Sequence, residues 1–131
     1  MSQGVAFVFP GQGSQSVGML ELYFSKQKKF NYVFDMSKEV LDVDFRDLIL
    51  NGVSEDLSPT EITQPLMLTA NNAIWECLEI KAEEVTVMAG HSLGEFSALV
   101  SSRALSFEDA LILVSSRAKF MQEAVPEGEG A

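Results

Sequence analysis

The sequence is poor in histidine, cysteine and basic residues. Its 131 residues include one histidine, His91, and one cysteine, Cys77. A single cysteine excludes an internal disulfide, and Cys77 lies among helical residues with no sign that its thiol is activated. The acidic residues are scattered and lack the spacing of metal ligands, so no metal site is expected.

Charge and hydrophobic runs narrow the range of partners. Nine Lys and Arg against nineteen Asp and Glu give a formal net charge of −10, which disfavours binding to nucleic acids and to anionic membranes. No run of about 18 apolar residues is present, so no membrane span is expected. The first residues lack a basic segment followed by an apolar one, so we expect no signal peptide and a cytoplasmic protein.

Two short apolar runs, residues 5–9 and 85–89, predict strands covered on both faces, as in a parallel sheet. Helical patterns separate and follow them, at about residues 19–25, 28–41, 44–50, 60–79, 95–102 and 106–124. This order predicts an α/β fold with a short parallel sheet flanked by helices. Because two strands make a narrow sheet, the chain is expected to be the front part of something larger.

Three of the helical segments carry finer predictions. Five side chains of residues 28–41 lie close to one face: Phe30, Val33, Phe34, Ser37 and Leu41. Residues 60–79 are expected to form two pieces, the second capped by Thr63 with Pro65 in its first turn. Ser106, with Asp109 three residues later, predicts a capping box at the start of the last helix.

The second strand runs into a turn that fits the pattern G-x-S-x-G, Gly90-His91-Ser92-Leu93-Gly94. A helix follows at once, and strand, turn and helix form the setting of a nucleophile elbow. Glycine is needed at both ends because side chains there would collide with the strand and the helix. Such a turn exposes the Ser92 hydroxyl at a helix N-terminus and lets the Leu93 N–H face an oxyanion. The alternative is a plain turn in which Ser92 only caps the helix.

The single histidine is poorly placed to act as a general base for Ser92. Adjacent side chains diverge in so tight a turn, whereas a base must come within about 3 Å of the hydroxyl. His91 is therefore expected to donate a hydrogen bond to bound substrate or to pack near the site in a structural role. With His91 excluded, the chain contains no histidine base.

A glycine-rich loop, Phe-Pro-Gly-Gln-Gly-Ser-Gln at residues 9–15, follows the first strand. A dinucleotide-binding loop is one interpretation, but Ser16 stands at its third glycine position, and the acidic residue about 20 positions on, Asp35, falls in a helical pattern. The other interpretation places a backbone N–H and the Gln12 amide beside the serine turn, because both loops leave the carboxyl ends of strands. Acyl transfer needs a second oxyanion donor of this kind.

The last helix carries an arginine on its inward side. Its apolar face is formed by Ala110, Val114, Ala118 and Met121. Arg117 points towards this stripe and should have an anionic partner, because a lone buried charge is costly. A guanidinium matches a carboxylate through two parallel hydrogen bonds. The partner is either a carboxylate of the chain such as Glu95, in a structural salt bridge, or a bound anion.

Four segments together are recognisable: FVFPGQGSQ at residues 7–15, Gln64-Pro65, GHSLGE at residues 90–95, and Arg117 with MQEAVP at residues 121–126. They resemble the malonyl-CoA:acyl-carrier-protein transacylases of fatty acid synthesis, and acyltransferase domains of polyketide synthases share the shorter motifs. The resemblance runs over essentially the whole chain. It implies part of a hydrolase-like core.

The resemblance also implies roles for the candidate residues. Ser92 would be the acylated nucleophile, Gln12 and Leu93 would supply oxyanion N–H groups, and Arg117 would bind the free carboxylate of a malonyl group. His91 matches a position that lines the same pocket. The implied reaction is ping-pong: Ser92 takes malonyl from coenzyme A and gives it to the phosphopantetheine thiol of an acyl carrier protein. Malonyl-CoA and this carrier are the implied partners, and no cofactor beyond the coenzyme A thioester is implied.

Family members are much longer than this chain. They insert a ferredoxin-like subdomain after the region matched here, and their histidine base lies well downstream of the serine. Residues 1–131 are therefore expected to be the N-terminal portion of one acyltransferase domain, with the ferredoxin-like subdomain missing. Without the base, this chain alone is expected to transfer malonyl very slowly, since losing a triad member costs several decades of rate.

Two other functions stay open. One is a non-catalytic remnant that binds a carrier protein, for which Lys26, Lys28 and Lys29 form the basic cluster. Carrier proteins are usually acidic, so the net charge of −10 opposes strong docking. The other is a serine esterase that uses the same turn, although an arginine in the pocket is less expected there.

Overall fold

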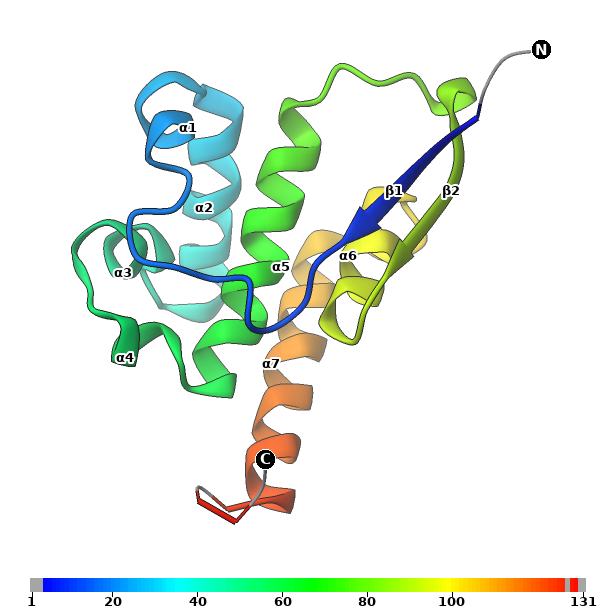
Figure 1. The fold of residues 1–131 in the computed structure, drawn as a ribbon. Helices are drawn as coiled ribbons and strands as arrows, with labels where there is room; N and C mark the ends of the chain where they lie inside the picture. The colour runs from blue at the N-terminus through cyan, green and yellow to red at the C-terminus, as the bar shows by residue number, and fades with distance from the viewer. Residues whose placement is uncertain (1–3, 127, 130–131) are drawn as a thin grey trace.

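The computed structural model describes residues 4–126 and 128–129, in which two strands pair and helices pack around them (Figure 1). The elements in chain order are β1 (Val5–Phe9), α1 (Glu21–Lys26), α2 (Lys28–Leu41), α3 (Phe45–Asn51), α4 (Ser54–Leu57), α5 (Thr60–Cys77), the 3-10 helix η1 (Ala82–Glu84), β2 (Val85–Gly90), α6 (Leu93–Ser101) and α7 (Phe107–Ala124). Figure 1 shows α1 to α4 on one side of α5 and the strands on the other. The predicted α/β class is confirmed.

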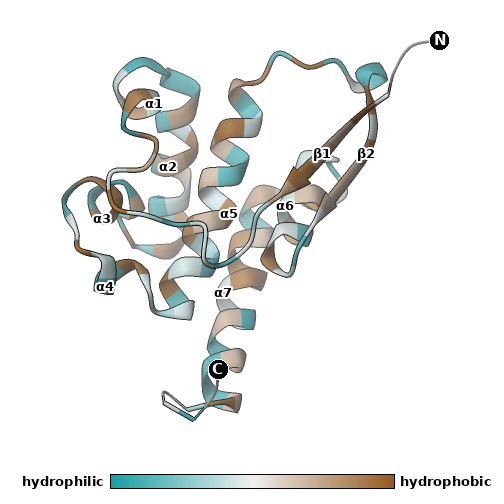
Figure 2. Cartoon of the chain, viewed as in Figure 1, coloured by the Kyte–Doolittle hydropathy of each residue, from teal (hydrophilic) through white to brown (hydrophobic). Residues whose placement is uncertain are grey.

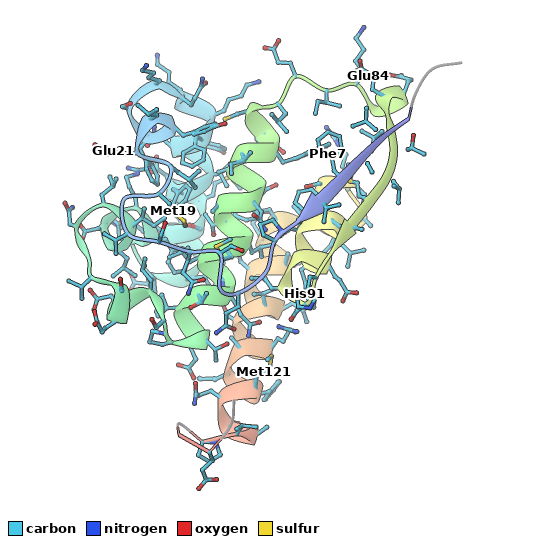
Figure 3. All side chains as sticks on the ribbon, viewed as in Figure 1. Phe7, Met19, Glu21, Glu84, His91 and Met121 are labelled. Atoms are coloured by element: carbon cyan, nitrogen blue, oxygen red, sulfur yellow. The ribbon has the colours of Figure 1, made fainter. Side chains whose placement is uncertain are left out.

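The two strands pair in parallel, as predicted, from Val5 opposite Val85 to Phe9 opposite Gly90. Parallel strands end at the same edge of a sheet, so the loop after β1 and the turn after β2 lie together. The His91 N–H donates to the Phe9 carbonyl at 3.4 Å. On the helical side, Phe7 lies between β1 and α5 (Figure 3), where its ring meets Trp75 edge-on at 5.1 Å between centroids.

The strands are more exposed than the sequence predicts. They are strongly apolar (Figure 2), yet the Val8 side chain is 76% exposed and the Val87 side chain 51%. The expectation that both faces are covered is wrong for the described residues. The reason is the narrow sheet: β1 and β2 pair only with each other in this part of the chain, and the contacts from α5 and α6 cover part of their surface.

The hydrophobic core lies between the helices, with α5 at its centre. Helix α5 packs against α2, α6 and α7, and its residues from Thr63 to Ala73 are buried. The predicted inner face of α2 is confirmed, since Phe30, Val33, Phe34 and Ser37 are buried and Leu41 is half-buried. Phe24 and Phe34 meet edge-on at 4.8 Å between ring centroids, an arrangement that aromatic pairs favour.

Helix α5 is continuous from Thr60, so the prediction of two pieces is wrong. Thr63 does not cap a second piece, because its hydroxyl donates to the carbonyls of Leu57 and of Pro59, the latter at 3.0 Å. These bonds fasten the start of α5 to the end of α4. Pro65 sits one turn into the helix, where burial between neighbouring helices offsets the missing N–H.

Helix α7 agrees with its prediction except at its end. The Asp109 N–H donates to Ser106 Oγ at 3.1 Å, so the N-cap of the predicted capping box is confirmed. The reciprocal bond from the Ser106 N–H to the Asp109 carboxylate is not formed among the described residues. The inner face holds Ala110, Leu111, Val114 and Ala118, all buried. Met121 is 44% exposed instead of buried, because the last turns of α7 extend beyond the other helices (Figure 1).

Asp44 joins α2 to α3, and replacing it should destabilise the fold. Its Oδ1 accepts from the Asp47 N–H at 3.0 Å as the cap of α3, and its Oδ2 meets Lys38 Nζ at 2.7 Å. The hydrogen bond from Lys38 and that from the Asp47 N–H hold the pKa of Asp44 below its ordinary value. We expect Asp44→Ala to lower the free energy of unfolding by about 1 kcal/mol at neutral pH, mostly through the lost cap, because exposed ion pairs contribute little.

The pH dependence of this loss follows from the direction of the shift. A carboxyl with a lowered pKa in the folded state stabilises the fold above its unfolded pKa and loses that contribution as the pH falls through the folded pKa. Urea unfolding of wild type and Asp44→Ala should therefore converge in acid. Glu39→Ala, an exposed carboxyl on α2, is the control. A difference that stays constant into acid would contradict this account of Asp44.

Candidate active site

Ser92 lies in the turn between β2 and α6 with φ 52° and ψ −113°. Such a backbone costs a non-glycine residue about 1–3 kcal/mol and is characteristic of functional sites. Although Ser92 occupies the N-cap position of α6, its hydroxyl makes no capping hydrogen bond. Its Oγ instead accepts from Nη2 of Arg117 at 2.9 Å. The alternative of a plain helix-capping serine is therefore wrong.

The two glycines of the turn allow the close approach that the sequence predicts. A Cβ on Gly90 would lie 1.9 Å from the carbonyl carbon of Gly94, and a Cβ on Gly94 would lie 2.2 Å from the carbonyl oxygen of Phe9. Both contacts are with backbone atoms, which cannot rotate away as a side chain would. The need for glycine at both positions is confirmed.

Gly94→Ala should lower the free energy of unfolding by about 3 kcal/mol or more, because the methyl group must push β1 away from α6. Gly13→Ala is the matched control: φ at Gly13 is +103° and no atom lies within 4 Å of the added Cβ, so only backbone strain of about 1–2 kcal/mol is expected. Chemical denaturation measures both. Equal losses in the two variants would show that the contact between Gly94 and Phe9 is not tight.

The loop after β1 rests directly on the serine turn. Gly11 is buried, and a Cβ there would lie 2.7 Å from the carbonyl oxygen of His91. Asn71 of α5 donates through Nδ2 to the Pro10 carbonyl and to Ser97 Oγ of α6, both at 3.0 Å. The structure thus holds Gly11, the neighbour of Gln12, against the serine turn. That the Gln12 N–H lies beside Ser92 stays a prediction. Asn71 was not identified from the sequence, although an asparagine inside a buried helix was a signal for it.

The backbone N–H groups of Gln12 and Leu93 donate no hydrogen bond among the described residues. Gln12 lies in the loop after β1 and is exposed, whereas Leu93 is the first residue of α6 and is fully buried. That both N–H groups face an oxyanion stays a prediction. The dinucleotide-binding interpretation requires an acidic residue that is free to bind a ribose. Asp35 lies within α2 and its carboxylate pairs with Arg46 at 2.7 Å, so it does not meet this requirement.

Arg117 points inward from α7 and is half-buried, as predicted. Its Nη1 donates to Gln64 Oε1, its Nη2 donates to Ser92 Oγ, and its guanidinium lies 5.7 Å from the centroid of the Phe96 ring. The predicted alternative, a salt bridge from Arg117 to Glu95, is wrong. Among the described residues, ion pairs join only Lys38 to Asp44 and Arg46 to Asp35. Arg117 therefore presents a positive charge at Ser92 that no described carboxylate neutralises.

Two residues one turn apart on α5 extend this contact to the loop after β1. Gln64 is 1% exposed and donates through Nε2 to Thr60 Oγ1 at 2.8 Å. The Thr60 hydroxyl in turn donates to Gln12 Oε1 at 2.9 Å. The sequence showed Gln64 only as part of a motif and did not single out Thr60. A chain of side-chain hydrogen bonds thus runs from Ser92 through Arg117, Gln64 and Thr60 to Gln12.

His91 lies at the end of β2 (Figure 3) and is exposed. None of the hydrogen bonds between described side chains joins it to Ser92. This agrees with the prediction that His91 is not the general base. His91 nevertheless lies next to Gly11, since a Cβ on Gly11 would lie 3.8 Å from Nδ1 of His91. The His91 ring therefore borders both the loop after β1 and the serine turn.

An open groove of about 710 Å³ passes beside this chain of hydrogen bonds and is lined in part by Gln12, Thr60 and Met121. In the described part of the chain, no three His, Cys, Asp or Glu side chains are grouped so as to hold a metal ion. No described helix is long and apolar enough to cross a membrane. Burial raises the pKa of the Cys77 thiol, which agrees with a thiol that is not activated. That no metal takes part stays a prediction.

Comparison with known proteins gives a consistent result. A family model described as the acyl transferase domain matches residues 6–131. Two curated relatives are named malonyl CoA-acyl carrier protein transacylase. The protein of Salmonella typhimurium is 48% identical over 126 residues, which are 95% of this chain and 41% of that protein. The protein of Bacillus subtilis is 44% identical over 127 residues, which are 97% of this chain and 40% of that protein.

Solved structures agree in fold. A malonyl CoA-acyl carrier protein transacylase from Coxiella burnetii superposes with a TM-score of 0.89 at 47% identity, covering 96% of this chain and 40% of that one. A malonyl-transacylase in complex with a type II PKS acyl-carrier protein gives a TM-score of 0.89 at 45% identity, covering 96% of this chain and 41% of that one. The chain thus spans about two-fifths of the length of these relatives.

Proposed function

The chain belongs to the acyl transferase domain family, and we propose that it carries the nucleophile and the carboxylate-binding arginine of an acyl-carrier-protein S-malonyltransferase. This enzyme would move a malonyl group from coenzyme A to the phosphopantetheine thiol of an acyl carrier protein. We further propose that residues 1–131 are the N-terminal portion of one acyltransferase domain, that they act in fatty acid synthesis, and that they do so in the cytoplasm.

The contact between Ser92 Oγ and the Arg117 guanidinium at 2.9 Å is the observation that carries the proposal. In a malonyl thioester one methylene group separates the free carboxylate from the reacting carbonyl. An acyl group joined to Ser92 would therefore bring its carboxylate within reach of Arg117. The guanidinium has five N–H donors, so it can release Ser92 and make two parallel hydrogen bonds to that carboxylate while Nη1 stays bonded to Gln64.

The acylation step follows from the groups around Ser92. The Ser92 hydroxyl loses its proton to a base and attacks the thioester carbonyl, forming a C–O bond. The N–H groups of Gln12 and Leu93 stabilise the tetrahedral oxyanion. The oxyanion collapses, the C–S bond breaks, and the thiol of coenzyme A leaves with a proton. In the second half, the carrier thiol attacks the ester and Ser92 regains its proton.

The general base is not among the groups bonded to Ser92, since His91 does not contact its hydroxyl and the sequence has no other histidine. The resemblance to malonyl-CoA:acyl-carrier-protein transacylases assigns this role to a histidine downstream of the matched region. We propose the same source for the base, with malonyl-CoA and an acyl carrier protein as partners, in keeping with the names of the relatives.

Intact-mass measurement of the full-length gene product tests this function. Incubation with malonyl-CoA should add one malonyl group, and peptide mapping should locate it on Ser92. Addition of a phosphopantetheinylated acyl carrier protein should then remove the group from the enzyme and place it on the carrier. Residues 1–131 alone should react far more slowly. A full-length product that forms no covalent adduct would refute the proposal and favour a carrier-binding remnant.

A serine esterase fits the site less well than a malonyltransferase. An esterase of neutral substrates has no use for Arg117, whose charge no described carboxylate neutralises. Competition between an uncharged ester and malonyl-CoA separates the two functions, because a malonyltransferase should react with the thioester first. Preferred hydrolysis of the uncharged ester would favour the esterase.

A further inference from the structure

The loop that holds Gln12 is fixed unevenly. On its N-terminal side, Gly11 is buried against the His91 carbonyl and Asn71 binds the Pro10 carbonyl at 3.0 Å. On its C-terminal side, Gly13 has φ +103° and nothing within 4 Å of a Cβ position, and its N–H is held only by the half-buried Gln15 side chain. Farther along, the Gly18 N–H donates to the Ile49 carbonyl of α3 at 2.7 Å. Between Gly11 and Gly18, the Gln12 side chain makes the one hydrogen bond among the described residues that joins this segment to a helix.

Thr60 is the residue that holds this side chain. It is the first residue of α5, its side chain is half-buried, and its hydroxyl donates to Gln12 Oε1 at 2.9 Å. No other hydrogen bond among the described residues reaches the Gln12 side chain. A fixed side chain restricts rotation about the N–Cα bond of Gln12, and thus the direction of its N–H.

In the chain of hydrogen bonds from Arg117 to Gln12, chemistry determines which group donates at each step. A guanidinium only donates, so the Gln64 amide must present its oxygen to Arg117 and its NH₂ group to Thr60. Thr60 Oγ1 then accepts from Gln64 and has its own hydrogen left to donate, which goes to Gln12. Because Gln64 is 1% exposed, water does not compete for its two bonds in this chain, whereas the bond from Thr60 to Gln12 lies at the surface, since Gln12 is exposed.

We infer that Thr60 is a positioning residue: through its hydroxyl it fixes Gln12 and aligns the Gln12 N–H with the oxyanion. The inference rests on the proposed function. It assigns Thr60 no contact with the substrate, so its effect should fall on the acylation rate and not on binding of malonyl-CoA. The same hydroxyl joins the residue that would bind the carboxylate to the loop that would bind the oxyanion.

The test is single-turnover acylation of the full-length gene product by malonyl-CoA, followed by quenching and intact mass. Thr60→Val keeps the shape and removes the hydroxyl. It removes the bond to Gln12 and also the bond accepted from Gln64. Loss of the bond to Gln12 should lower the maximal acylation rate about three- to tenfold, while Gln64 keeps its bond to Arg117 and the malonyl-CoA concentration at half-maximal rate is unchanged. Thr60→Ser should restore the rate. Thr86→Val, an exposed threonine on β2, is the matched control and should react like wild type.

A double-mutant cycle separates positioning from a general loss of stability. Gln12→Ala removes the side chain that Thr60 holds but keeps the backbone N–H, so it should slow acylation to a similar extent. Adding Thr60→Val to Gln12→Ala should cause no further loss, because Thr60 acts on the loop through its bond to Gln12, which Gln12→Ala has already removed. Additive losses, or a Thr60→Val rate equal to wild type, would overturn the inference while leaving the malonyltransferase in place. A wild type that is not acylated would overturn both.

Discussion

Ser92→Ala in the full-length gene product should abolish the malonyl adduct and lower transfer to the carrier protein roughly ten-thousand- to million-fold. The reason is that in the proposed mechanism Ser92 Oγ forms the covalent bond to the acyl group, and no neighbouring hydroxyl can take its place. The nearest serine on α6, Ser97, is buried and its Oγ is bonded to Asn71. Intact mass and a transfer assay with the carrier protein measure the two losses.

Two further variants guard this result against misfolding. Ser102→Ala removes an exposed hydroxyl at the other end of α6, where Ser102 Oγ donates to the Leu99 carbonyl at 3.1 Å, and it should keep full activity. Ser92→Gly should be as inactive as Ser92→Ala but no less stable than wild type, because glycine adopts φ 52° without strain. A malonyl adduct that persists in both Ser92 variants would remove Ser92 from the mechanism.

The serine turn and the strands before it could be predicted from sequence because their constraints are local. A tight turn between a strand and a helix requires glycine where the two backbones are in van der Waals contact. The glycines at positions 90 and 94 therefore predict this turn from the sequence alone. The apolar stripe of α2 is equally local, since its period places Phe30, Val33 and Phe34 on one side. Both predictions are confirmed.

The links between the site residues could not be predicted, because they join positions far apart in the chain. Thr60 and Gln12 are separated by 48 residues, and Arg117 and Gln64 by 53. Periodicity places Arg117 on the inner side of α7 but does not say which polar group it meets there. Glu95 was a reasonable partner on charge alone, yet α5 brings the neutral Gln64 to this position instead.

The exposure of the strands and the continuity of α5 differ from prediction because both depend on which elements pack against them. An apolar run such as residues 5–9 indicates which surface can be buried, whereas burial depends on what packs against it. Pro65 suggested a helix boundary, but the hydroxyl of Thr63 and the neighbouring helices stabilise one helix across it. That continuity places Thr60 and Gln64 one turn apart, which the chain of hydrogen bonds requires.

Arg117→Ala in the full-length gene product should invert the acyl preference. On the proposed function, the variant loses two charge-assisted hydrogen bonds to the malonyl carboxylate, so kcat/KM for malonyl-CoA should fall roughly 100- to 1,000-fold. A substrate with an uncharged acyl group, such as acetyl-CoA, makes no such bonds through that group, and its acyl group should be transferred at least as well as by wild type. The ratio of the two kcat/KM values in one competition assay therefore measures what Arg117 contributes to selectivity, independently of the amount of active enzyme.

The charge and the shape of the arginine can be separated on the same helix. Arg117→Lys keeps a cation but loses the planar pair of donors, so we expect a loss of about tenfold for malonyl-CoA, smaller than that of Arg117→Ala. Lys119→Ala removes an exposed cation two residues away, and should leave the preference unchanged because a solvated charge contributes little at the site. If Arg117→Ala and Lys119→Ala change the preference equally, the positive field of α7 would explain selectivity. If only Arg117→Ala changes the preference, Arg117 must contact the carboxylate directly. The hydrogen bond from Arg117 to Ser92 Oγ supports this result, because it places the guanidinium beside the oxygen that would carry the malonyl group.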